Sequence, residues 1–227
     1  MYYLKARLFP TMLTIIPFIT FIFLLTEKYS DCIIALGNYS ILLSRLSFIP
    51  AVIFLMVLIN RFVAKEIFQR FYFADELNMQ TTIMLLLSDS ELPFSIKENI
   101  RKQIEIKFGI KLKDAYSENQ NPEVAKKLIA IAVSQMRNVL RGNKMLLNHN
   151  IEYGFVRNFI GRSFISFLFS LICTIICFNL SNESKYTILF ACFTFFYLVP
   201  IVFSNFLVKK HGKYYAKVLF EQFLTLK

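Results

Sequence analysis

Four apolar runs constrain this chain more than any other feature of its sequence. They cover residues 8–25, 41–59, 163–180 and 187–208, and they are 18, 19, 18 and 22 residues long. About 20 helical residues, with a usable range of roughly 17 to 25, cross the hydrocarbon core of a bilayer. The composition agrees, because 56% of the residues are hydrophobic and 26 are phenylalanine, more apolar surface than a soluble domain of this length buries. We therefore predict an all-α integral membrane protein with four transmembrane helices.

The four runs form two pairs on either side of a long polar segment. This spacing predicts a first transmembrane hairpin at residues 1–60, a helical domain at 61–160, a second hairpin at 161–208 and a basic tail at 209–227.

Helix signals punctuate the middle domain. Ser95 and Glu98 form a capping-box pattern that opens a helix, and Gly109 is placed to close it. Asn121 followed by Pro122 is a second helix start, and residues 111–121 are predicted to be a loop. A last helix over 143–160 is expected to lead into the third span.

The distribution of positive charge predicts the orientation in the membrane. Residues 60–162 carry sixteen Lys and Arg against eleven Asp and Glu, and residues 209–227 carry five Lys. The connections 26–40 and 181–186 carry only one Lys each. By the positive-inside rule, both termini and the middle domain face the cytoplasm from an inner or plasma membrane.

The usual catalytic constellations are missing from the sequence. There is no phosphate-binding glycine loop, no zinc-protease motif and no nucleophile elbow. His149 has no nucleophile beside it, and Cys173 and Cys177 share a helix face without further metal ligands. We predict that the protein is not an enzyme and that it needs no metal and no cofactor.

Four polar residues near the predicted spans are candidates for lining a pore or for coupling the middle domain to the membrane. Arg45 is the one charge inside a predicted span. Tyr153, Arg157 and Asn158 lie just before the third span. The alternative for all four is an interfacial anchor of basic and aromatic side chains.

Residues 60–162 have a surplus of five positive charges. Topology and anionic lipid headgroups both favour such a surplus, but it could also serve an anionic ligand, such as a nucleotide messenger or nucleic acid. The best-placed cations for a binding site are Lys97, Arg101, Lys102, Lys126, Lys127 and Arg137.

Small residues follow one face of the third span. Ser166, Ser170, Cys173 and Cys177 recur at helical spacing, and small residues let membrane helices approach closely. This stripe predicts the seam of a homo-oligomer.

The run from Asn150 to Asn158, Asn-Ile-Glu-Tyr-Gly-Phe-Val-Arg-Asn, joins the middle domain to the second hairpin. The whole architecture, with two spans, a helical insertion and two more spans, resembles the four-span effectors of bacterial nucleotide-signalling anti-phage systems and the membrane subunit of the Kiwa system. The resemblance implies an effector that oligomerises and permeabilises or depolarises the inner membrane on a cytoplasmic signal. The alternative is a non-conducting sensor or scaffold that recruits a cytosolic defence partner. The expected partners are membrane lipids, further copies of the chain, and a cytosolic protein or anionic nucleotide messenger.

Overall fold

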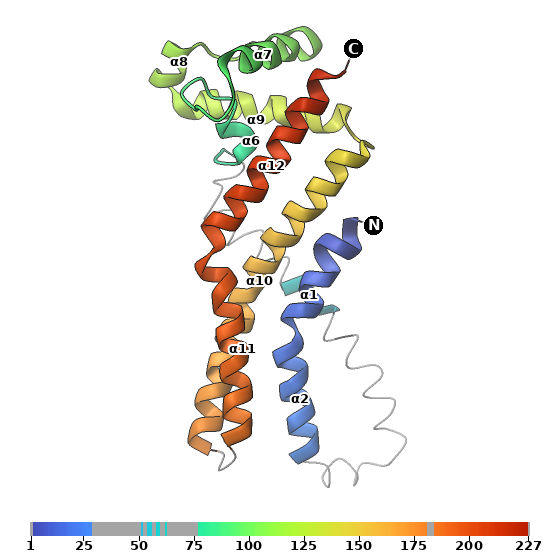
Figure 1. Ribbon diagram of the computed structural model, residues 1–227, viewed down its shortest axis with the longest axis vertical. Helices are drawn as coiled ribbons and strands as arrows, with labels where there is room; N and C mark the ends of the chain where they lie inside the picture. The colour runs from blue at the N-terminus through green and yellow to red at the C-terminus, as the bar shows by residue number, and fades with distance from the viewer. Residues whose placement is uncertain are drawn as a thin grey trace. The chain divides into compact units, whose positions relative to one another are not determined.

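The computed structural model describes residues 2–28, 77–180 and 184–226, together with positions 51, 54, 55, 58, 59 and 62. Every regular element in these residues is helical, which confirms the all-α prediction for this part of the chain. The elements are a π-helical turn at Leu4–Leu8, α1 Phe9–Thr14, α2 Ile16–Lys28, α6 Gln80–Ile83, α7 Phe94–Phe108, α8 Ala115–Gln120, α9 Pro122–Val139, α10 Lys144–Leu180, α11 Ser184–Val202 and α12 Ser204–Leu224 (Figure 1).

The chain divides into two compact units. The apolar unit contains Met1–Ala64 and Gly154–Asn205, and the polar unit contains Lys65–Tyr153 and Phe206–Lys227. The segment 209–227, predicted as a separate basic tail, belongs to the polar unit, and its residues 209–224 are part of α12.

In the described part of the chain, three helical stretches are long and apolar enough to cross a membrane, namely Leu4–Leu25, Lys144–Asn179 and Ser184–Val202. These stretches expose many large apolar side chains, among them Phe23, Ile172, Phe178, Phe195 and Val202. Exposed apolar surface on this scale is unfavourable in water and is expected of helices that face lipid. The predicted span at 41–59 lies outside the described residues except for five positions, so a fourth span stays a prediction.

The polar unit has its own hydrophobic core. Helix α9 contributes a buried face of small and medium side chains, Ala125, Ile129, Ala132, Val133 and Met136. From α12, Leu219, Phe220 and Phe223 are buried, and the Phe223 ring stacks on Phe108 at 5.7 Å between centroids. Helices α6, α7, α8 and α9 gather around this core (Figure 1).

The helix ends of the polar unit test the local sequence signals. Gly109 closes α7 with φ 66°, as predicted, and α9 begins at Pro122 after Asn121. The capping box was wrong, because α7 already begins at Phe94 after Pro93 and Ser95 lies inside its first turn. The predicted loop at 111–121 was wrong in part, because residues 115–120 form α8.

Helix α8 begins where a side chain supplies the missing backbone partner. The Asp114 carboxylate accepts a hydrogen bond from the Ser117 backbone N–H at 2.8 Å. Such a cap satisfies one of the orphan donors in the first turn. The cap turns the second half of the expected loop into a short helix.

Candidate functional site

Two prolines leave backbone carbonyls without donors in the apolar unit. In an α-helix the carbonyl of residue i accepts from the N–H of residue i+4, and proline has no N–H. Pro10 therefore removes the ordinary donor to Ala6, and Pro17 removes the donor to Leu13. The helix is interrupted here, since a π-helical turn precedes α1 and a turn at Ile15 separates α1 from α2. Lipid offers no hydrogen bonds, so these carbonyls need partners from the protein.

Side chains from distant parts of the chain satisfy both carbonyls. The Asn158 Nδ2 atom of α10 donates to the Ala6 carbonyl at 2.6 Å. The Tyr197 hydroxyl of α11 donates to the Leu13 carbonyl at 2.6 Å. Asn158 and Tyr197 are both buried. We call the π-helical turn, α1 and α2 together the first helix. Each of its two prolines is thus matched by a polar side chain from another helix, which donates to the carbonyl that the proline leaves without its ordinary donor.

Among the described residues of the apolar unit, Arg162 is the most deeply buried charged side chain, with 2% of its surface exposed. Its Nη1 atom donates to the Arg7 carbonyl and to the Thr11 Oγ1 atom. Its Nε atom is buried and has no hydrogen-bond partner in the described part of the chain. Both acceptors are neutral. The described residues that hydrogen-bond to Arg162 therefore do not balance its positive charge.

Sequence analysis missed Arg162, because the apolar run was taken to begin at Ser163. The pattern that could have revealed it is the spacing of Asn158, Arg162 and Ser166, four residues apart on one face of α10. The Ser166 hydroxyl completes the set by donating to the Thr14 carbonyl at 2.6 Å. We call the donors Asn158, Arg162, Ser166 and Tyr197, with their acceptors on residues 6–14, the polar interface.

The small-residue stripe lies along the same side of α10. Ser166, Ser170 and Cys173 are buried within the single chain, and Cys177 is half-buried. Ser170 donates to the carbonyl of Ser166 at 2.7 Å. The stripe therefore has helices of its own chain beside it, and its use as a seam between copies stays a prediction.

The structure describes two of the three other residues proposed for a pore or for coupling. Arg45 lies outside the described residues. Tyr153 belongs to the polar unit, where its buried ring stacks on Tyr215 with centroids 6.1 Å apart. Arg157 is half-buried in α10. Among the described residues of this set, only Asn158 is part of the polar interface.

Lys97, predicted to bind an anion, is a structural residue of the polar unit. Its side chain is 1% exposed, and its Nζ atom donates to the carbonyls of Leu86, at 2.7 Å, and Asp89. Burial lowers the pKa of Lys97, while the nearby Asp89 carboxylate acts in the opposite direction. The amine closes the loop after α6 onto α7.

The other predicted cations do not converge on one site. Arg101 pairs with Glu118, and Lys126 donates to the Asn78 Oδ1 atom at 2.9 Å. Arg137 makes a long contact of 3.4 Å with the Thr81 hydroxyl. Lys102 and Lys127 are exposed on α7 and α9. An anion could reach Lys102 and Lys127 without breaking a contact that the structure shows for either side chain.

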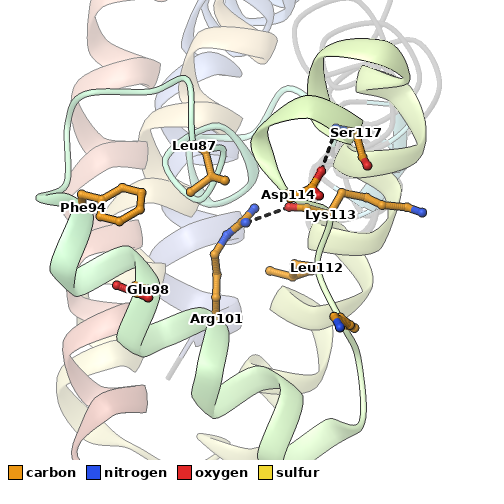
Figure 2. Close-up of a pocket in the computed structure, with 9 residues that line it drawn as sticks. Leu87, Phe94, Glu98, Arg101, Leu112, Lys113, Asp114 and Ser117 are labelled. Atoms are coloured by element: carbon orange, nitrogen blue, oxygen red, sulfur yellow. Dashed lines mark hydrogen bonds between the residues drawn. The ribbon is translucent and has the colours of Figure 1, made fainter.

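One pocket of about 520 Å³ lies in the polar unit between the start of α7 and the segment before α8 (Figure 2). Arg101 points across it and donates to the Lys113 carbonyl at 2.8 Å. Charged side chains of both signs line it, Glu98 and Asp114 together with Arg101, Lys111 and Lys113. This mixed lining does not select an anion by charge.

The described residues contain no group of three or more His, Cys, Asp or Glu side chains that could hold a metal ion. Comparison with known proteins gives no match to a family model, to a curated protein or to a solved structure.

Proposed function

We propose that this protein is a membrane effector of bacterial anti-phage defence, which oligomerises and permeabilises or depolarises the inner membrane on a cytoplasmic signal of infection. The observation that carries the proposal is the polar interface inside the apolar unit. Polar and ionisable side chains at membrane depth are costly, and those that occur there often mark ion pathways or switches. The defence setting is supported by the architectural resemblance alone.

The polar interface links helix separation to the entry of water. Four carbonyls, of Ala6, Arg7, Leu13 and Thr14, accept from side chains of other helices. Each polar group left without a partner in hydrocarbon costs several kcal/mol. Separation of α10 and α11 from the first helix is therefore favourable only if water replaces the lost donors. A separated state would be a hydrated one, and a hydrated path across the membrane is a leak.

The trigger in this proposal acts on the polar unit. Its exposed Lys102 and Lys127 are the predicted anion-binding residues best able to meet a ligand. A ligand shifts the two states only if it binds them unequally. Because Lys97 and Arg101 hold the unit together, Lys102→Glu with Lys127→Glu tests an anionic trigger without removing these structural contacts.

Copies of the chain would meet through lipid-facing surface in this proposal. Helix α11 exposes Phe195, Phe196, Val199 and Val202. Cys192 is also exposed on α11, whereas Cys173 is buried. Oxidative cross-linking of Cys192 would report contact between copies along α11.

The test measures the membrane directly. Cells that express the protein are infected with phage, and membrane potential and entry of an impermeant dye are recorded; proteoliposomes are assayed for dye leakage. Tyr197→Phe removes the donor to Leu13 and should raise basal leakage. Tyr186→Phe, at the start of the same helix, is the control and should behave like the wild type. Unchanged permeability on infection, together with no added leakage in Tyr197→Phe, would reject the effector function.

A second function is favoured by one observation on α9. Val124, Ile131 and Val139 expose about half of their surface, with values of 48%, 52% and 53%. They follow each other along one side of the helix, next to the buried face. An exposed apolar face can dock a partner, as a non-conducting sensor or scaffold requires. Recruitment of a cytosolic protein that is lost in Ile131→Asp, with permeability unchanged, would support this alternative.

A further inference from the structure

The beginning of the first helix and the middle of α10 are joined by a contact between two basic residues, since Arg162 donates to the Arg7 carbonyl. Residues 1–26 and 153–182 contain four Lys or Arg residues and no Asp or Glu. Both segments belong to the apolar unit, apart from Tyr153. A positive charge in a low-dielectric environment is costly unless an anion lies close by.

Arg162 is the buried member of this pair. Its guanidinium holds the Arg7 carbonyl and the Thr11 hydroxyl oxygen, while its Nε hydrogen has no acceptor among the described residues. Neutral oxygens satisfy hydrogen bonds without cancelling charge. The segment around Arg7 is thus held against the buried guanidinium of Arg162. The positive charge of this guanidinium is not neutralised by the two oxygens that it contacts.

Arg7 is the reachable member of the pair. Its side chain is half-buried, and its guanidinium lies 5.7 Å from the ring centre of Tyr2 and 6.0 Å from that of Tyr3. Tyr3 is 52% exposed. Tyrosine rings are typical of the membrane–water interface, where their hydroxyl groups meet the headgroups. A planar guanidinium is well suited to bind a phosphate through two hydrogen bonds.

We infer that Arg7, flanked by Tyr2 and Tyr3, binds the phosphate oxyanion of an anionic phospholipid. Arg162 is a positioning residue, since it fixes the Arg7 backbone and adds its own charge behind it. This inference shares only the membrane location with the proposed function, and it holds for a sensor as well as for an effector. A soluble phosphate has the same chemistry, so the test separates the two sources.

The experiment uses the full chain, without any trigger, in nanodiscs of phosphatidylcholine alone or with added phosphatidylglycerol. Native mass spectrometry counts retained anionic lipid, and the midpoint of thermal unfolding is recorded for each preparation. Arg7→Gln should retain roughly tenfold less anionic lipid, which corresponds to about 1.4 kcal/mol, and should lose the stabilisation by phosphatidylglycerol. Lys5→Gln, an exposed cation two residues away, is the control and should keep both.

A positioning role for Arg162 predicts a graded series. Arg162→Lys should retain more anionic lipid than Arg162→Gln, because it keeps the charge. Equal lipid retention in wild type and Arg7→Gln would overturn the inference, even if Arg162→Gln fails to fold. Equal stabilisation by inorganic phosphate in phosphatidylcholine would assign the site to a soluble anion and overturn the lipid assignment. Dye leakage is not measured here, so this result is independent of the effector test.

Discussion

The Tyr197 hydroxyl donates to the Leu13 carbonyl at 2.6 Å across 184 residues of sequence, because Pro17 cannot donate to it. The proline that removes the backbone donor lies on α2, and the side chain that replaces this donor lies on α11. This relationship makes the effect of a substitution at one residue depend on the identity of the other.

We expect Tyr197→Phe to destabilise the chain by about 1–3 kcal/mol, the cost of a buried carbonyl left without a partner. In a Pro17→Ala background the alanine N–H can donate to Leu13, so Tyr197→Phe should cost less. Thermal unfolding of the four variants in detergent micelles, followed by circular dichroism, gives the coupling energy. Equal costs in the two backgrounds would show that the hydroxyl does not substitute for the missing backbone donor.

Ser170→Leu tests where the small-residue stripe packs. Ser170 is fully buried within the single chain, and insertion of a large side chain into packed surroundings costs typically about 1–3 kcal/mol. The unfolding temperature of the monomer should therefore fall. Leu171→Ile, at an exposed neighbour, should leave it unchanged.

The two outcomes of that substitution are separable by size-exclusion chromatography with light scattering. Loss of assembly with an unaltered unfolding temperature would mean that the stripe joins copies of the chain, as the sequence pattern suggests.

The sequence predicts the apolar helices because hydropathy depends only on local composition. It also predicts the end of α7 at Gly109 and the start of α9 at Pro122, because the backbone conformation of glycine or proline alone determines each of these helix ends. It could not predict which face of α9 is buried. The pair Ala125 and Ala132 and the pair Val124 and Ile131 both follow the helical period. Only packing against α6, α7 and α8 decides that the face with the two alanines is the buried one.

The site was harder to predict, for a physical reason. Lys97 was predicted to bind an anion, and in the structure its amine donates to the carbonyls of Leu86 and Asp89, which the loop after α6 brings to it. Arg162 was not predicted as a site residue, and its acceptors lie on the first helix, at sequence separations of 155 and 151. Tertiary partners of this kind leave no local pattern in the sequence.

The cap on α8 should weaken in acid. The Ser117 backbone N–H lowers the pKa of Asp114 below its ordinary value of 3.8. The folded state therefore binds this proton less well than the unfolded state. The stabilising effect of the ionised Asp114 cap is complete above pH 3.8 and is lost as the pH falls through the lowered pKa of Asp114.

Nuclear magnetic resonance of the full chain in micelles can follow the Ser117 amide during an acid titration. Its shift should move with a midpoint below 3.8, the ordinary pKa of the carboxyl group. Asp114→Asn keeps an acceptor oxygen and should abolish the titration while α8 persists. A midpoint at the ordinary value would contradict the capping bond.

Membrane topology can be tested by cysteine labelling. We expect residues 1–7, 60–162 and 209–227 to be cytoplasmic because they hold the basic residues. A cysteine at position 119, which is exposed in the polar unit, should react only after the inner membrane is made permeable. A cysteine at position 182 should react in intact spheroplasts. Labelling of position 119 from the periplasm would overturn the orientation.

Gly154 marks a close approach between α10 and the first helix. A Cβ atom at this position would lie 2.9 Å from the Tyr2 hydroxyl oxygen and 3.2 Å from the Ala6 Cβ atom. In an unconstrained helix interior, replacing glycine by alanine stabilises by roughly 1 kcal/mol. Here we expect Gly154→Ala to lower the unfolding temperature, because the contact with Ala6 offers no flexible side chain to move. Tyr2→Phe removes the nearer atom and should restore part of the loss in the double variant. A gain in stability for Gly154→Ala alone would show that helix propensity outweighs the close contact.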